Sequence, residues 1–201
     1  LVDAWERQDR AALKEHLDRA FKFLTMLGIP FMVGAFFTAT PVMKLIAGPD
    51  FIASGPILQI LSLAFAFICV SSILTHTVVA IGKQKTMLGG FALAALTGGI
   101  GFFTLGPRLG GLGIAISTAA AELVTLLFAS ILVWRATRVF FSPCILWKIV
   151  FSSALMAGAL WALTEAPVLV MVAAGMAVYG LGLFLTRAIT LGMVREIVKF
   201  N

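Results

Sequence analysis

Few side chains in this sequence could do chemistry, and the most informative of them is Glu122. It is the only formally charged residue well inside a long apolar stretch, and an ionised carboxylate is costly to hold in lipid. Glu122 must therefore face protein, water or a cation. Two interpretations stay open: a protonatable group that couples transport to a gradient, or a structural acid that hydrogen-bonds a neighbouring helix.

Four further polar side chains are candidates for transport or coupling, and each also has a plainer explanation. Gln59 and His76 lie near opposite ends of one apolar stretch, where a satisfied packing role competes with a ligand role. Lys83 and Lys85 follow that stretch in a short polar turn. Their charge would help to hold a diphosphate, but it equally favours a cytoplasmic location for the turn.

The sequence patterns that carry enzyme chemistry are missing. Gly82-Lys83 lacks both the upstream glycine and the following Ser or Thr of a phosphate-binding loop. His16 and His76 are too few and too far apart for a metal centre, and no nucleophile elbow occurs. We therefore predict that the chain is not an enzyme and has no cofactor or metal. Any activity of the chain must therefore be a conformational change that is driven by an ion gradient or by the concentration of a substrate.

The elements that hold the candidate residues are six stretches between Lys22 and Arg187 that are almost free of charge. A helix needs about 20 apolar residues to cross the bilayer core, and five of the stretches suffice unaided. The stretch 149–164 is shorter and becomes adequate if residues 145–147 join it. The six stretches are 23–43, 51–82, 86–107, 109–134, 149–164 and 166–186.

Composition agrees with a membrane protein. Hydrophobic residues make up 61% of the chain and charged residues 12%, and the mean hydropathy is +1.06. Too little polar surface is left to cover a soluble globule. Long unbroken apolar stretches favour helices over a barrel, whose strands alternate in polarity. The predicted fold is all-α: a polytopic membrane bundle of six transmembrane helices preceded by a cytoplasmic amphipathic helix.

The charges between the stretches predict the orientation. All of the 15 Lys and Arg residues except Lys44 and Arg108 fall on one side of the predicted membrane, and such residues favour the cytoplasm. We expect both ends of the chain to be cytoplasmic. This asymmetry and attraction to anionic lipids account for the net charge of +6. The predicted partner is the lipid bilayer, with no nucleic acid.

Residues 1–21 are predicted to form a separate element. Trp5, Leu13, Leu17 and Phe21 recur at helical spacing, which indicates an amphipathic helix that runs into the first span. It could connect this chain to an absent upstream half, or bind a regulator or partner. The predicted domains are this connector, 1–21, and the six-span bundle, 22–201.

Small residues at four-residue spacing predict close approach of helices, with substrate contact as the alternative. Pro30, in the middle of the first stretch, is expected to kink its helix. The small residues form three groups: Gly90, Ala94 and Gly98; Gly113, Ser117, Ala121 and Thr125; and Ala154, Gly158 and Ala162.

The order of several short motifs suggests a family. The segment 41–51, PVMKLIAGPDF, followed by SGPILQIL at 54–61, resembles a junction of polysaccharide flippases in the multidrug/oligosaccharidyl-lipid/polysaccharide exporter superfamily. AIGKQK at 80–85 is similar to the cytoplasmic turn of that family, and GGLGIA at 110–115 with Glu122 to the entry of its next span. The resemblance covers about residues 5–140. Ile114-Ala115 stands where two small residues are usual.

The resemblance implies a function by alternating access. The chain would be the C-terminal half of an exporter of 12 to 14 spans in the bacterial cytoplasmic (inner) membrane, and its N-terminal half would be missing from this chain. Its substrate would be a polyprenyl-diphosphate-linked sugar, moved from the cytoplasmic to the outer leaflet. The alternatives are a multidrug or metabolite antiporter, a peptidoglycan-precursor flippase, and a non-transporting scaffold of a cell-envelope synthesis complex.

Overall fold

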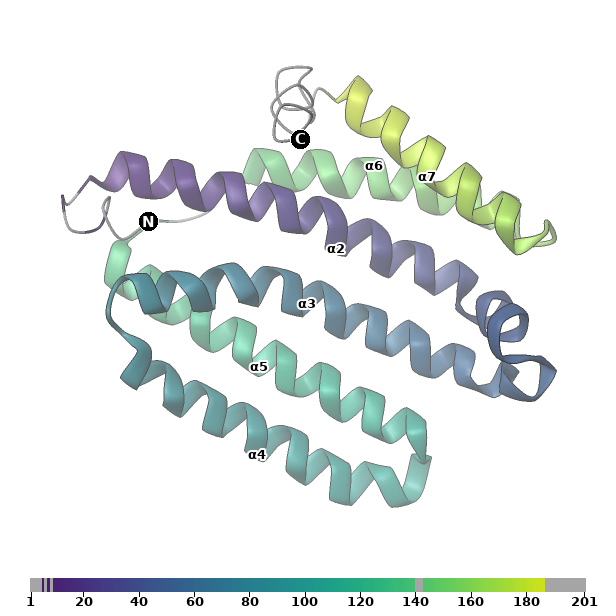
Figure 1. The fold of residues 1–201 in the computed structure, drawn as a ribbon, viewed down its shortest axis with the longest axis horizontal. Coiled ribbons are helices and arrows are strands. Elements are labelled where there is room, and N and C mark those ends of the chain that lie inside the picture. The colour runs from purple at the N-terminus through teal and green to yellow at the C-terminus, as the bar shows by residue number, and fades with distance from the viewer. Residues whose placement is uncertain (1–4, 6, 8, 140–142, 187–201) are drawn as a thin grey trace.

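The structure is a computed structural model and describes residues 5, 7, 9–139 and 143–186. These residues form α-helices and one 3-10 helix, η1, and no strand occurs among them. Figure 1 shows the helices running side by side. The elements are α2 (Arg10–Ala47), η1 (Pro49–Ser54), α3 (Gly55–Ala80), α4 (Gln84–Leu109), α5 (Gly111–Thr137), α6 (Pro143–Ala162) and α7 (Val168–Leu185).

The all-α membrane bundle predicted from the sequence is confirmed. In the described residues, five helices are long and apolar enough to cross a membrane, and the apolar part of α6, Leu146–Ala162, is shorter. Helix α6 itself begins at Pro143, so residues 145–147 do extend the short stretch. The basic tail, Arg187, Arg195 and Lys199, lies outside the described residues.

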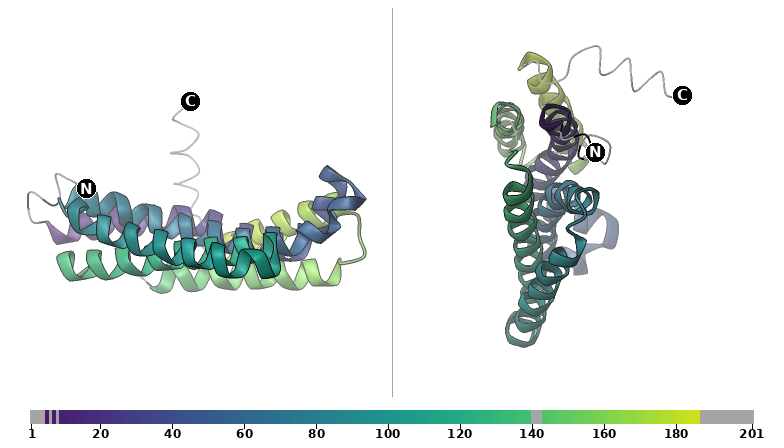
Figure 2. Two further views of the ribbon diagram at one scale, coloured as in Figure 1. Left: turned by 90° about the horizontal axis from the view of Figure 1, so that it is seen from below. Right: turned by 90° about the vertical axis from the view of Figure 1, so that its left-hand side faces the viewer.

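The helices are arranged in a row rather than around a closed centre. α4 packs on α5, α5 on α3, and α3 on α2, while α2 also contacts the paired helices α6 and α7. Figure 2 shows the resulting elongated, shallow assembly from two further sides. Large apolar side chains stay exposed on most helices, among them Phe36, Leu96, Phe103 and Leu181. Such surfaces suit lipid or further helices.

From Arg10 onward, the predicted connector and the first span form one continuous helix, α2. Asp9 caps α2, because its carboxylate accepts hydrogen bonds from the backbone N–H groups of Ala11 and Ala12 at 3.1 and 3.0 Å. Leu13, Leu17 and Phe21 are buried against Ile73 of α3. The 38 residues of α2 span about 57 Å at 1.5 Å per residue. That exceeds the bilayer core of about 30 Å. The domain boundary between residues 21 and 22 stays a prediction.

Tight turns join the central helices. Gly110 alone separates α4 from α5, and its φ of 58° is a conformation that glycine adopts without steric cost. Gly82 has a φ of 71° between α3 and α4. These short connections keep neighbouring helices antiparallel and adjacent.

Small residues bring α4 and α5 into close contact, as the sequence predicted. A Cβ added at Gly113 would overlap the backbone carbonyl of Leu105, and one at Gly90 would overlap the Phe128 ring. A Cβ at Gly98 would lie 3.3 Å from that of Ala121. Each glycine therefore permits an approach that a larger side chain would prevent.

The packing prediction for the third group, Ala154, Gly158 and Ala162 of α6, is not confirmed among the described residues. All three residues are exposed, and nothing lies within 4 Å of a Cβ added at Gly158. The buried face of α6 carries bulkier side chains instead. Met156 contacts Gly34 of α2, and Leu160 contacts Gly175 of α7. The small residues that permit these contacts therefore lie on the partner helices.

Candidate functional site

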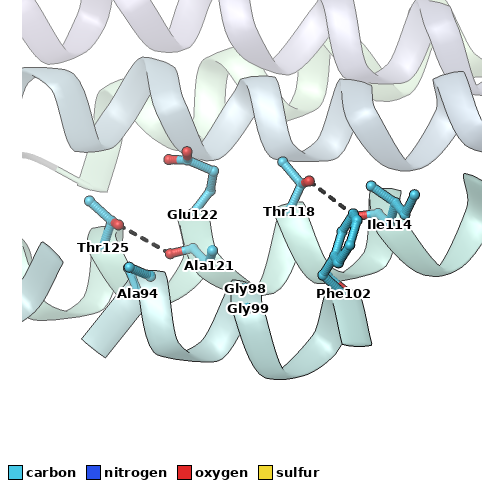
Figure 3. Close-up of a pocket in the computed structure, with 11 residues that line it drawn as sticks. Ala94, Gly98, Gly99, Phe102, Ile114, Thr118, Ala121, Glu122 and Thr125 are labelled. Atoms are coloured by element: carbon cyan, nitrogen blue, oxygen red, sulfur yellow. Dashed lines mark hydrogen bonds between the residues drawn. The ribbon is translucent and has the colours of Figure 1, made fainter. Parts of the chain in front are cut away.

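Glu122 lies in an open groove between α4 and α5. The groove has a volume of about 500 Å³, and Figure 3 shows Glu122 on α5 with Thr118 and Thr125 about one turn away on either side. Helix α4 contributes its small residues Ala94, Gly98 and Gly99 to the opposite wall. Glu122 itself is half-buried, and Figure 3 shows its carboxylate directed away from Ala94, Gly98 and Gly99.

The polar atoms of this groove are mainly hydrogen-bond acceptors. The Thr118 hydroxyl donates to the carbonyl of Ile114 at 3.0 Å, and the Thr125 hydroxyl to that of Ala121 at 3.1 Å. With their protons used in this way, the two hydroxyl oxygens keep lone pairs that can accept. In the part of the chain that the structure describes, Glu122 takes part in no hydrogen bond or ion pair. The groove thus suits a cation, a proton or a donor group.

Gln59 joins two helices through a hydrogen bond. Its side-chain amide on α3 donates to the backbone carbonyl of Phe36 on α2 at 2.6 Å. This contact matches the packing interpretation that the sequence left open for Gln59. A ligand role for Gln59 stays a prediction.

The remaining candidate residues are not brought to Glu122. His76 is exposed near the end of α3, and Lys83 and Lys85 are exposed in and after the turn that leads into α4. The walls of the Glu122 groove come from other residues of α4 and α5. The five candidates therefore form no single site, and a role for each of them stays a prediction.

A metal centre built from protein ligands is not found among the described residues. No group of three or more His, Cys, Asp or Glu side chains could hold a metal ion there. Cys69 is a buried free cysteine against Gly28 of α2, so it fills space at the α2–α3 contact.

An apolar groove that was not predicted from the sequence lies between α2, α6 and α7. Its volume is about 470 Å³, and its lining is almost entirely hydrocarbon. Leu27 and Phe31 come from α2, Met156 from α6, and Val172 and Met176 from α7. No short motif marks it, because the lining side chains are ordinary in any membrane helix.

Two polar features lie at the α2–α6–α7 contact. The Tyr179 hydroxyl of α7 donates to the backbone carbonyl of Met26 at 2.9 Å. Lys22 of α2 and Lys148 of α6 are both half-buried. They are close enough for their positive charges to repel each other. Met26 lies one turn beyond Lys22 and packs beside Ile149, which follows Lys148. The two lysines therefore stand at one end of the apolar groove.

A multi-pass helix bundle with an apolar groove, an intramembrane acid and no enzyme motif is typical of a membrane transporter. The class of this chain is the multidrug/oligosaccharidyl-lipid/polysaccharide exporter superfamily. Comparison with protein-family models identifies the family within it. The model described as "Lipid II flippase MurJ" matches residues 2–188. The chain belongs to this family of flippases, which are transporters and not enzymes.

A solved structure agrees with the family at the level of the fold. The lipid II flippase MurJ in its inward closed conformation is similar to this chain, with a TM-score of 0.79 and 24% sequence identity. The match covers 90% of this chain and 40% of the flippase. The chain thus spans less than half the length of the solved protein. Among curated proteins, no sequence matches it.

These comparisons confirm the superfamily and the flippase class, and they correct the branch. The short motifs resemble those of polysaccharide flippases, whereas the matching family is that of lipid II flippases. These motifs, such as Gly48 and Gly82-Lys83, lie in turns between helices. Turns of this kind report how the helices are connected, and they carry no information about the head group of the substrate.

Proposed function

We propose that this chain is part of a flippase that moves lipid II, the lipid-linked peptidoglycan precursor, across the bacterial cytoplasmic membrane by alternating access. The observation that carries the proposal is the family match over residues 2–188. The large head group of such a lipid cannot cross hydrocarbon unaided. A transporter must shield the head group while its chain stays in lipid.

The apolar groove between α2, α6 and α7 is the proposed path of the lipid chain. Its wall of aliphatic, methionine and phenylalanine side chains matches an isoprenoid in polarity, and its open side admits a chain from the bilayer. Lys22 and Lys148 stand at one end of the groove, so we expect the lipid to lie with its diphosphate at that end. Positive charges at headgroup level attract a diphosphate.

Glu122 is the proposed coupling group. Its groove between α4 and α5 presents acceptor oxygens at membrane depth, and ionisable residues inside membrane segments commonly mark ion or proton pathways. We keep Gln59, His76, Lys83 and Lys85 as secondary candidates. Lys83 and Lys85 would attract the anionic substrate at the loading face.

We expect the remaining helices of the full-length flippase to pack on the exposed apolar faces of this chain. The chain matches 40% of the solved flippase, and alternating access needs two bundles that rock against one another. A non-transporting scaffold would need no such groove, and we therefore place it second.

The test of the proposal is depletion of the full-length protein in cells, with separate measurement of lipid II and of other polyprenyl-linked sugars in each leaflet. Lipid II should accumulate in the cytoplasmic leaflet, and it should return to normal when the gene is restored. Accumulation of a different lipid-linked glycan would favour the polysaccharide branch. Normal distribution of every lipid would overturn the proposal.

The groove itself can be tested by filling it. Val172 lines the groove and is 38% exposed, whereas Val170, on the same helix, does not line it and is 48% exposed. Val172→Trp should weaken the binding of a fluorescent polyprenyl-diphosphate lipid to the full-length protein by about tenfold, because displacing about two buried methylenes costs that much. Val170→Trp is the matched control. Equal affinities of the two variants would contradict the proposed path.

A further inference from the structure

Pro30 creates an unpaired acceptor in α2. Proline has no backbone N–H, so position 30 cannot donate to the carbonyl of Met26, four residues earlier. In a membrane no water is at hand to replace that bond, and an unsatisfied carbonyl is costly there. The Met26 carbonyl therefore needs a donor from outside α2.

The Tyr179 hydroxyl of α7 supplies that donor. It lies 2.9 Å from the Met26 oxygen, and Tyr179 is the single tyrosine of the chain. Its ring is held by two apolar clusters. One contains Ile149 and Leu183 and the other Met156 and Leu160, so the hydroxyl is presented from a packed position.

The other contacts of this region are apolar and give little directional hold. Met156 meets Gly34 across the α2–α6 contact, and Leu160 meets Gly175 across α6–α7. Lipid tails are as apolar as these side chains, so such contacts resist sliding of the helices only through their shape. The hydrogen bond from Tyr179 to Met26 defines one register of α7 on α2.

We infer that Tyr179 is a positioning residue that fixes α7 on α2 at the carbonyl left without a helical partner by Pro30, and so sets the width of the apolar groove. Met26, Pro30 and Tyr179 all line that groove. The polar contact thus lies in the wall that it positions. The assignment of the groove to a lipid chain rests on the proposed function, but this contact does not.

The test is a double-mutant cycle in the full-length protein, with Cys69 and Cys144 replaced. Spin labels at Leu27→Cys on α2 and Met176→Cys on α7 report the distance across the groove. Tyr179→Phe keeps the ring and removes one oxygen. It should raise the population with displaced α7 about threefold, the usual effect of losing one hydrogen bond between membrane helices.

The cycle is completed in a Pro30→Ala background. There position 30 regains its N–H and satisfies Met26 within the helix, so Tyr179→Phe should leave the distance distribution unchanged. An equal effect in both backgrounds would show that Tyr179 acts through packing alone. If Tyr179→Phe left the distance distribution unchanged in the protein that retains Pro30, the inference would also be overturned.

An infrared difference spectrum gives an independent measurement. In protein labelled with carbonyl-¹³C methionine, Tyr179→Phe should move one carbonyl band to higher frequency, and an unchanged spectrum would contradict the inference. Neither measurement involves transport. A negative result in the lipid II assay would therefore leave this inference intact, and failure of this inference would leave the assay unaffected.

Discussion

At the scale of single residues, the polar groups of this chain differ in what surrounds them. Gln59 and Tyr179 each donate to a backbone carbonyl of α2, and their polar atoms are thereby used in holding helices together. Glu122 lies in a groove of acceptors. An acid with that environment at membrane depth is suited to exchange protons or cations.

Removing the charge of Glu122 should separate transport from folding. We expect Glu122→Gln to lower lipid flux across a pH gradient by about tenfold, within the usual range of coupling between sites, while membrane insertion stays normal. The measurement is flux in proteoliposomes that contain the full-length protein.

The control for this prediction is Glu165→Gln, because Glu165 is an exposed acid outside the groove. Flux through that variant should match the parent protein. Unchanged flux through Glu122→Gln would remove Glu122 from the mechanism and leave the structural interpretation.

At the scale of the elements, α2 is the central helix of the arrangement. It packs on α3 along one side and on α6 and α7 along the other, and it contains both Pro30 and Pro41. Side chains from both neighbours donate to its carbonyls. Motion of the α6–α7 pair relative to α3 must therefore pass through contacts on α2.

The α4–α5 contact provides a second prediction at this scale. Gly113→Ala should destabilise the protein by about 1–3 kcal/mol, the usual cost of overpacking, because the added methyl would overlap the backbone of Leu105. Backbone cannot move aside as a flexible side chain can. The measurement is the free energy of unfolding of the full-length protein in detergent.

Gly89→Ala is the matched control, since nothing lies within 4 Å of a Cβ added at Gly89. It should cause no loss of stability. If both variants unfolded at the same denaturant concentration as the parent, close α4–α5 packing would not limit stability.

At the scale of the whole molecule, the orientation in the membrane remains a prediction from charge. The turn at Lys83 and Lys85 should be cytoplasmic, and Asp50 and Glu165 should face outward. Single cysteines at positions 50, 85 and 165, in a protein without Cys69 and Cys144, can be tested with an impermeant maleimide.

In intact cells the reagent should label positions 50 and 165, and in inverted vesicles it should label position 85. The helix order makes this a strict test, because α3 must carry the chain from one face to the other. Labelling of positions 50 and 85 from the same side would contradict the topology.

The sequence by itself determined the elements and the class. Uninterrupted apolar stretches predict membrane helices because backbone groups in lipid must pair within their own segment. The turn at Gly82 was expected only from the resemblance of residues 80–85 to a family motif, and the positive φ of Gly48, Gly82 and Gly110 came from the structure. The acid at Glu122 was conspicuous against its apolar neighbours.

Tertiary structure decided which faces meet and therefore where the grooves lie. Ala154 and Gly158 form a small-residue stripe that stays exposed, while Met156 and Leu160 of the same helix are buried. Tyr179 and Met26 are separated by 153 positions in the chain, and only the packing of α7 on α2 brings them together. Nearly every face of these helices is apolar, so hydrophobicity could not select the contacts; shape and a few hydrogen bonds did.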